Sequence, residues 1–139
     1  MIMVELPKKS DDLAVVFKSA AVPDLSDFTG KYYVNMLTGL PSLRRLGHHK
    51  IFYTVDNEAL GYNVVLRRWG HFRLEMGVLE EDGLGFLMLD YGVDRNTFLT
   101  RGIRDQVRCI EPGSLYLGRT NLLLRSKLRF VGYFTLSRE

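Results

Sequence analysis

Two clusters of basic and aromatic residues carry the side chains best suited to hold a small molecule. The first is the stretch 67–73, where a regular strand would place Trp69, His71 and the flanking arginines on one face. If that face lines a cavity, the indole offers a stacking surface and the basic groups offer hydrogen-bond donors. If Gly70 instead marks a bend or bulge, the arginines lie on a solvated face and carry no function. The sequence leaves both interpretations open.

The second cluster follows Asp90 and is rich in arginine. In a strand, Arg104 and Arg108 point the same way and Asp105 points the opposite way, while Arg119 comes from the next predicted strand. If the arginine face is interior, its guanidinium groups can hold a carboxylate or phosphate through forked hydrogen bonds. If the face is exterior, it is solvated. Strand alternation is compatible with either orientation.

Acid–base chemistry is the alternative use of such a cavity. Asp90, Asp105 or His71 could act as a general base if burial tuned its pKa. The sequence has no nucleophile elbow, phosphate-binding loop or dinucleotide fingerprint. His48 and His49 are adjacent and have no third ligand at a recognisable spacing, so we predict neither a metal site nor a cofactor.

These side chains must be positioned by one helix and a series of strands. Ser10, followed by two acids, is typical of a helix start, and an apolar stripe at helical spacing continues to about residue 21, where Pro23 stops it. We expect this helix, over about 10–21, to pack across a barrel mouth or along its side. From about 30 to 137 the apolar period is two, with turn signals at short intervals and no crossover helices.

The chain is therefore predicted to be a single all-β domain, 1–139, folded as an antiparallel up-and-down β-barrel of 8–10 strands with a short N-terminal helix. No run of apolar residues is long enough to span a membrane, and we expect no membrane partner. Cys109 is the only cysteine, which excludes an intrachain disulfide and favours the cytoplasm. The net charge of +3 does not favour nucleic acid as a partner, and a homodimer is left open.

Two short motifs resemble those of the calycin superfamily, which includes lipocalins and fatty-acid-binding proteins. Gly30-Lys31-Tyr32-Tyr33 is similar to the Gly-x-Trp-Tyr motif of the first lipocalin strand, and Leu89-Asp90-Tyr91 is similar to their Thr-Asp-Tyr motif. The third lipocalin feature is an arginine near the last strand that covers the first-strand aromatic residue, and either Arg129 or Arg138 could take that place. The resemblance implies a barrel with a ligand cavity.

We therefore expect a barrel that binds a small hydrophobic or amphipathic ligand, with an anionic head as the favoured form. The alternatives are a small isomerase, cyclase or hydrolase in the same cavity, and an interaction module without a ligand. The predicted ligand-binding residues are Tyr33, Tyr62, Trp69, His71, Tyr91, Arg104, Arg108, Tyr116 and Arg119.

Overall fold

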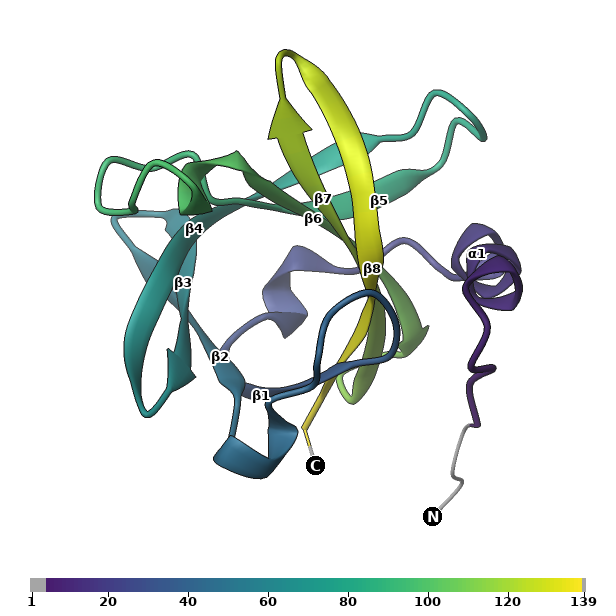
Figure 1. Ribbon diagram of the computed structural model, residues 1–139, viewed down its shortest axis with the longest axis horizontal. Helices are drawn as coiled ribbons and strands as arrows, with labels where there is room; N and C mark the ends of the chain where they lie inside the picture. Colours follow the sequence, from purple (N-terminus) through teal and green to yellow (C-terminus); the bar gives the residue numbers. More distant parts are fainter. Residues whose placement is uncertain (1–4, 139) are drawn as a thin grey trace.

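The computed structural model describes residues 5–138 and shows a closed barrel of eight antiparallel strands, in which each strand pairs with its neighbours in sequence and β1 pairs with β8 (Figure 1). The expected fold class is confirmed. The strands are β1 (Gly30–Met36), β2 (His49–Val55), β3 (Glu58–Val65), β4 (Arg67–Val78), β5 (Gly85–Asp90), β6 (Ile103–Glu111), β7 (Leu115–Leu124) and β8 (Lys127–Ser137). The helical elements are α1 (Ser10–Ser19) and three single 3-10 turns, η1 (Leu25–Asp27), η2 (Arg44–Leu46) and η3 (Thr100–Gly102).

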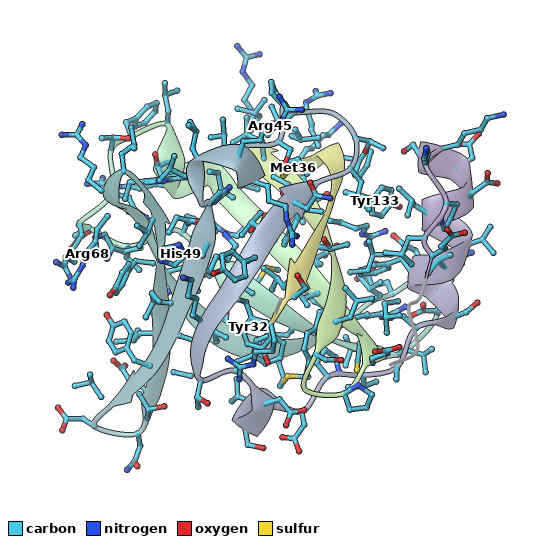
Figure 2. The ribbon with its side chains drawn as sticks, turned by 90° about the horizontal axis from the view of Figure 1, so that it is seen from below. Tyr32, Met36, Arg45, His49, Arg68 and Tyr133 are labelled. Atoms are coloured by element: carbon cyan, nitrogen blue, oxygen red, sulfur yellow. The ribbon has the colours of Figure 1, made fainter. Side chains whose placement is uncertain are left out.

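The two ends of the barrel differ, because each antiparallel strand reverses the direction of the chain. The β1–β2, β3–β4, β5–β6 and β7–β8 connections all leave at one end, which we call the open end. The β2–β3, β4–β5 and β6–β7 turns leave at the other end, which we call the closed end. In Figure 2, Arg45 and Met36 lie towards the open end and Tyr32 lies nearer the closed end.

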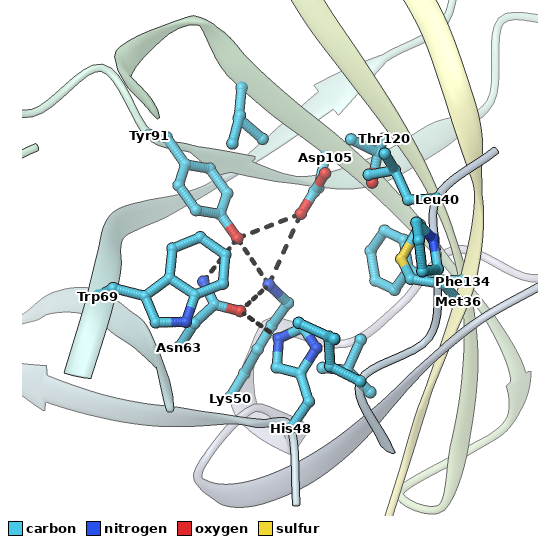
Figure 3. Close-up of a pocket in the computed structure, with 14 residues that line it drawn as sticks. Met36, Leu40, His48, Lys50, Asn63, Trp69, Tyr91, Asp105, Thr120 and Phe134 are labelled. Carbon is cyan, nitrogen blue, oxygen red and sulfur yellow. Dashed lines mark hydrogen bonds and ion pairs between the residues drawn. The ribbon is translucent and has the colours of Figure 1, made fainter. Parts of the chain in front are cut away.

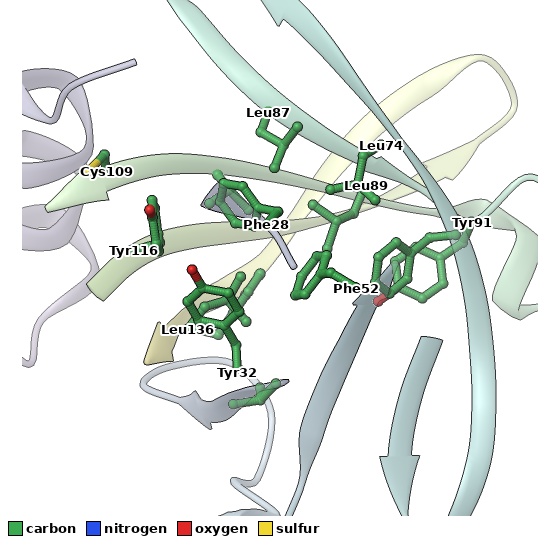
Figure 4. Close-up of a cluster of buried hydrophobic side chains, with 14 residues drawn as sticks. Phe28, Tyr32, Phe52, Leu74, Leu87, Leu89, Tyr91, Cys109, Tyr116 and Leu136 are labelled. Atoms are coloured by element: carbon green, nitrogen blue, oxygen red, sulfur yellow. The ribbon is translucent and has the colours of Figure 1, made fainter. Parts of the chain in front are cut away.

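Aromatic side chains fill the interior at the closed end (Figure 4). The chain passes from η1 into β1 beneath the barrel, and Phe28 inserts its ring between Tyr116 and Phe52, at centroid distances of 4.6 and 5.3 Å. The Tyr32 hydroxyl donates to the Asp27 carbonyl. This half of the barrel is therefore a packed core, closed by a plug from the N-terminal segment.

Arg138, directly after β8, covers the aromatic residue of the first strand. Its guanidinium carbon lies 3.9 Å from the centre of the Tyr32 ring, and it donates to the carbonyl oxygen of Lys31. Of the two arginines that the sequence left open for this position, the structure places Arg138 there. The contact ties the end of the chain to the beginning of the barrel wall.

Helix α1 lies along the side of the barrel, which decides between the two positions expected for it. It begins at Ser10, the residue expected as its cap, and the capping residue is instead Lys9, which makes no side-chain cap. Leu13 and Phe17 are buried against Phe86 and Leu117 on the outer face of the sheet. Outward-facing residues of β5 and β7 are therefore apolar because the helix covers them.

Candidate functional site

The open half of the barrel holds a pocket with a cavity volume of about 140 Å³ (Figure 3). Apolar and aromatic side chains form its walls and a group of polar side chains forms its floor. The barrel is thus filled at one end and hollow at the other. The lining residues are Val34, Met36, Leu40, Pro41, Leu43, His48, Lys50, Asn63, Trp69, Tyr91, Ile103, Asp105, Thr120 and Phe134.

The floor is a hydrogen-bonded network centred on Lys50, whose ammonium group is almost fully buried (Figure 3). Lys50 Nζ donates to Asn63 Oδ1 at 2.7 Å and to the Tyr91 hydroxyl at 2.6 Å. The Tyr91 hydroxyl also accepts from Asn63 Nδ2 at 3.0 Å and donates to Asp105 Oδ2 at 3.3 Å. Lys50 lies on β2, Asn63 on β3 and Asp105 on β6, and Tyr91 follows directly after β5, so the network forms only when these strands are assembled in the barrel.

The hydrogen bonds of Asn63 define which atoms of the network remain free. Asn63 Nδ2 donates to the carbonyl oxygen of Gly70 at 3.1 Å, so Asn63 Oδ1 must be the acceptor for both Lys50 and His48 Nε2, the latter at 3.1 Å. A neutral His48 therefore carries its proton on Nε2, and its Nδ1 is a bare acceptor. His48 Nδ1 is buried with no hydrogen-bond partner within residues 5–138, and the second Asp105 oxygen, Oδ1, has none there besides the neighbouring Thr120 side chain.

Charge in the network is balanced by Lys50 and Asp105. Their closest N···O distance is 3.8 Å, and both side chains are about 5% exposed. Burial lowers the pKa of Lys50 to about 8 despite the attraction of Asp105. Burial likewise raises the pKa of Asp105, against the opposing effect of Lys50. The rings of Phe72 and Tyr91, 5.2 and 5.3 Å from Lys50 Nζ, further favour the ammonium form.

His48 should make the protein less stable in acid. Burial, and then the charge of Lys50, lowers the pKa of His48 from 6.5 to about 4. Between those values the unfolded chain binds a proton that the folded chain does not, so stability falls as the pH decreases through this window. The loss from this group reaches up to about 3 kcal/mol near its lower end.

Urea unfolding of the wild type and the His48→Gln variant at pH 7 and near pH 4 measures how much of the loss in unfolding free energy in acid comes from His48. The Gln side chain can still donate to Asn63 Oδ1, so the hydrogen bond is kept. The acid loss should be smaller in His48→Gln. A His49→Gln variant, altered at the next residue on the outer wall of the barrel, is the matched control. An equal acid loss in the wild type and His48→Gln would contradict the assignment.

A β-bulge at Gly70 separates the faces of Trp69 and His71. Gly61 pairs with Phe72 and Asn63 pairs with Trp69, so β4 carries one more residue than β3 between these pairs. Gly70 has φ +58°. Trp69 consequently turns into the pocket mouth, and His71 turns to the outer wall. The shared face expected for these residues is wrong, and the bulge interpretation of Gly70 holds.

A Gly70→Ala variant tests whether the bulge positions the pocket. A Cβ at this residue would lie 3.0 Å from Asn63 Nδ2 and 3.1 Å from the Tyr91 ring, in addition to the left-handed backbone. The backbone alone costs about 1–2 kcal/mol. Trp69 is the only tryptophan, so a shift of its emission reports movement of the pocket wall.

Gly83→Ala is the control, because Gly83 has φ +68° and nothing within 4 Å of an added Cβ. We expect Gly70→Ala to lose more stability than Gly83→Ala and to shift the tryptophan emission, whereas Gly83→Ala leaves the emission unchanged. Equal stability losses and unchanged emission in both variants would refute the positioning role.

The predicted ligand-binding residues other than the arginines lie in three places: the pocket, the packed closed end and the outer wall of the barrel. Trp69 and Tyr91 line the pocket. Tyr116 lies inside the barrel but in the packed closed end, where its hydroxyl donates to Asp27 Oδ2. The outer wall holds Tyr33, Tyr62 and His71, of which the last two are brought together with a ring distance of 5.8 Å.

Arg104 and Arg108 of β6 and Arg119 of β7 lie outside the barrel. Of the two orientations considered for the arginine face of β6, the structure therefore has the exterior one. Arg104 forms an ion pair with Asp90 at 3.2 Å. Arg119 lies over the Phe17 ring and hydrogen-bonds to Gln106. Arg108 is fully buried beneath α1. None of them lines the pocket.

Sequence reasoning missed Lys50, His48 and Asn63. The apolar alternation of the second strand suggests Ile51 and Tyr53 as its inner face, yet Lys50 and Phe52 are the buried residues. No local signal distinguishes these faces, since both contain apolar residues. Asp105, by contrast, was named as a general-base candidate and lies in the pocket.

No protein-family model matches the chain, and no curated protein matches it. Among solved structures, a protein from Thermomonospora curvata has a similar fold, with a TM-score of 0.61 and 15% sequence identity over 94% of this chain and 88% of that chain. At this identity the likeness shows the fold alone. The fold and its pocket make the chain capable of binding a small ligand.

Proposed function

We propose that the barrel binds a small, neutral and largely apolar molecule of about one ring, whose polar group donates hydrogen bonds to the pocket floor. The observation that carries the proposal is the unpartnered acceptor His48 Nδ1, which lies with the Asp105 carboxylate in the lining of an apolar-walled pocket. Buried acceptors without partners are costly, and a ligand that donates to them recovers that cost on binding.

The size of the ligand follows from the cavity. Its volume of about 140 Å³ is close to that of a dry engineered cavity that admits benzene. Trp69 and Phe134 lie on its walls and offer ring faces for stacking. Phenols, indoles and other N–H heterocycles have the right size and the right donor.

The donor requirement revises the anionic head favoured by the sequence. That expectation depended on inward-facing arginines, and Arg104, Arg108 and Arg119 lie outside the barrel. The cation of the pocket is Lys50, which already donates to Asn63 and Tyr91 and faces Asp105. The Asp105 carboxylate would repel a bound carboxylate, whereas a neutral hydroxyl or N–H group is not repelled.

Matched ligands test the proposal. Titration with phenol, toluene and benzoate, read by Trp69 emission and by the melting temperature, compares a donor, an apolar isostere and an anion. We expect phenol to bind at least about tenfold more tightly than toluene. Asp105→Asn should narrow that difference, because its amide can turn a donor towards the ligand. Tighter binding of benzoate than phenol, or no response to any of a broad panel of such compounds, would refute the proposal.

Acid–base catalysis is the second candidate. It is favoured by Asp105, which is buried beside a cation in a pocket with a polar floor. Asp105 and His48 could remove and return a proton on a bound ligand, as an isomerase requires. Incorporation of solvent deuterium into the carbon skeleton of a bound ligand, lost in Asp105→Asn, would support this function. The absence of exchange in ligands that bind tightly would exclude it for them.

A relationship to the calycin superfamily is part of the same proposal. It is supported by the Arg138–Tyr32 contact and by the 3-10 turn η1 that precedes β1 and closes one end of the barrel. A cytoplasmic location remains a prediction from the single cysteine.

A further inference from the structure

The open end of the barrel exposes large apolar side chains on, or directly beside, all four of its connections. The most exposed are Leu66 at 86%, Phe98 at 86% and Leu99 at 81%. Leu66 lies in the β3–β4 turn, and Phe98 and Leu99 lie in the β5–β6 connection, directly before η3. The other exposed apolar residues of this end are Leu40, Leu43, Leu46, Trp69, Leu123, Leu124, Leu128 and Phe130. Leu25, Val55, Val78 and Leu84 are exposed at or near the closed end, but most of the exposed large apolar residues lie at the open end. Such a gathering marks an interaction surface.

The same end is strongly basic. The segments 37–48, 66–69, 91–102 and 123–130 contain Asp94 as their single acidic residue. All of their arginines and lysines are exposed. These cations are Arg44, Arg45, Arg67, Arg68, Arg95, Arg101, Arg125, Lys127 and Arg129.

The closed end has the opposite charge. Its three turns, taken with the strand residues Glu58 and Glu111 that border them, are the segments 56–58, 79–84 and 111–114, and they contain no arginine or lysine. Their acids are Asp56, Glu58, Glu80, Glu81, Asp82 and Glu111. The small net charge of +3 is therefore the sum of a positive open end and negative turns at the closed end. Such a molecule approaches a negatively charged surface with its open end first.

We propose that the open end docks on an anionic phospholipid surface, with the exposed apolar tips entering the headgroup region and the surrounding cations contacting the lipid phosphates. Basic side chains interleaved with exposed Phe, Leu and Trp are the combination that binds the interface of an anionic bilayer. Docking would place the mouth of the pocket against the membrane. The proposal does not depend on the identity of the pocket ligand.

The apolar tips distinguish a lipid surface from nucleic acid. Phosphate contacts with DNA or RNA use the cations alone, and single-stranded bases stack on aromatic rings. Neither uses aliphatic side chains such as Leu66 and Leu99 that project into solvent. A bilayer uses both the cations and the aliphatic tips.

The proposal departs from the sequence expectation of no membrane partner. That expectation considered chain segments that cross a bilayer, and within residues 5–138 no helix has the length and apolar character to do so. Surface docking needs no such segment. It needs the three-dimensional gathering of four connections at one end, which no single stretch of sequence displays.

Vesicle co-sedimentation of the full chain tests the proposal. Vesicles of phosphatidylcholine alone are compared with vesicles containing about one-third phosphatidylserine. We expect binding to the anionic vesicles only, and weaker binding as salt is added. The double variant Phe98→Ser/Leu99→Ser should bind about tenfold more weakly or worse, and so should Lys127→Glu/Arg129→Glu.

Two matched variants control for net charge and for loss of apolar surface. Lys8→Glu/Lys9→Glu makes the same change in net charge beside α1, and Val15→Ser/Val78→Ser removes exposed apolar groups away from the open end. Both should bind vesicles as the wild type does. Equal loss in the control and open-end variants would overturn the proposal, as would salt-sensitive binding to single-stranded RNA without binding to anionic vesicles.

Discussion

Replacing Lys50 by Met is expected to destabilise the protein by about 3–5 kcal/mol and to alter the pocket floor. Lys50 is the cation that neutralises Asp105, and both are buried. Removing one partner of a buried pair leaves the other without compensation, so the cost exceeds the net value of the pair. Asn63 Oδ1 and the Tyr91 hydroxyl would also lose a donor at 2.7 and 2.6 Å.

The loss should depend on pH, because Asp105 can escape it by taking up a proton. Burial already raises the pKa of Asp105, and without Lys50 the pKa rises further. The destabilisation of Lys50→Met, measured by urea unfolding relative to wild type, should therefore be greatest at neutral pH and above, and smaller in acid.

The double variant Lys50→Met/Asp105→Asn is the decisive comparison. Since it removes both charges, it should be more stable at pH 7 than the sum of the two single changes predicts. Strict additivity of the two changes would show that the pair is not coupled, and would contradict the charge balance that we assign to the pocket floor.

Arg108→Met is expected to cost about 3–5 kcal/mol by separating α1 from the barrel. The guanidinium group is fully buried, although it points away from the barrel interior. It forms a fork with Asp82, at 2.8 and 3.0 Å, and donates to three backbone carbonyl oxygens, those of Phe17, Leu84 and Gly85. The same fork lowers the pKa of Asp82 to about 2.

Urea unfolding gives the free-energy loss, and amide hydrogen exchange over residues 10–19 shows whether the helix opens separately. Asp82→Asn is the control: it should cost less, because the three carbonyl oxygens keep their donor. Arg108→Lys should fall between the two, since an ammonium group cannot reproduce the fork. An Arg108→Met variant with wild-type exchange in the helix would exclude the anchoring role.

Period-two alternation and turn residues were sufficient to predict the architecture. The strands expected over about 30–137 are found as β1 to β8, and the helix expected over about 10–21 is found over Ser10–Ser19, so it ends before Pro23 is reached. The arginine that covers the aromatic residue of the first strand was expected from the resemblance to the calycin motifs, and the structure places Arg138 there. Local backbone preferences and hydrophobic periodicity carry the information on the strands, the turns and the helix, because they act within a few residues.

The sequence did not show which face of each strand points into the barrel, and this orientation determines which residues line the pocket. Both faces of β2 contain apolar residues, so only closure of the barrel turns Lys50 inward. The extra residue at Gly70 reverses the expected face of Trp69 relative to His71. Arg108 of β6 is buried because α1 and the β4–β5 turn supply its hydrogen-bond partners, and the sequence of β6 gives no sign of these contacts.

By itself, then, the sequence determined an antiparallel barrel with one helix and placed Trp69, Tyr91 and Asp105 among the candidate residues. The tertiary structure alone decided that the arginines of β6 and β7 face outward, that a lysine forms the pocket floor, and that the basic and apolar connections share one end. The physical reason is that a strand has two equivalent faces until its neighbours pair with it. Which face is interior, and therefore which side chains meet, is a property of the closed sheet.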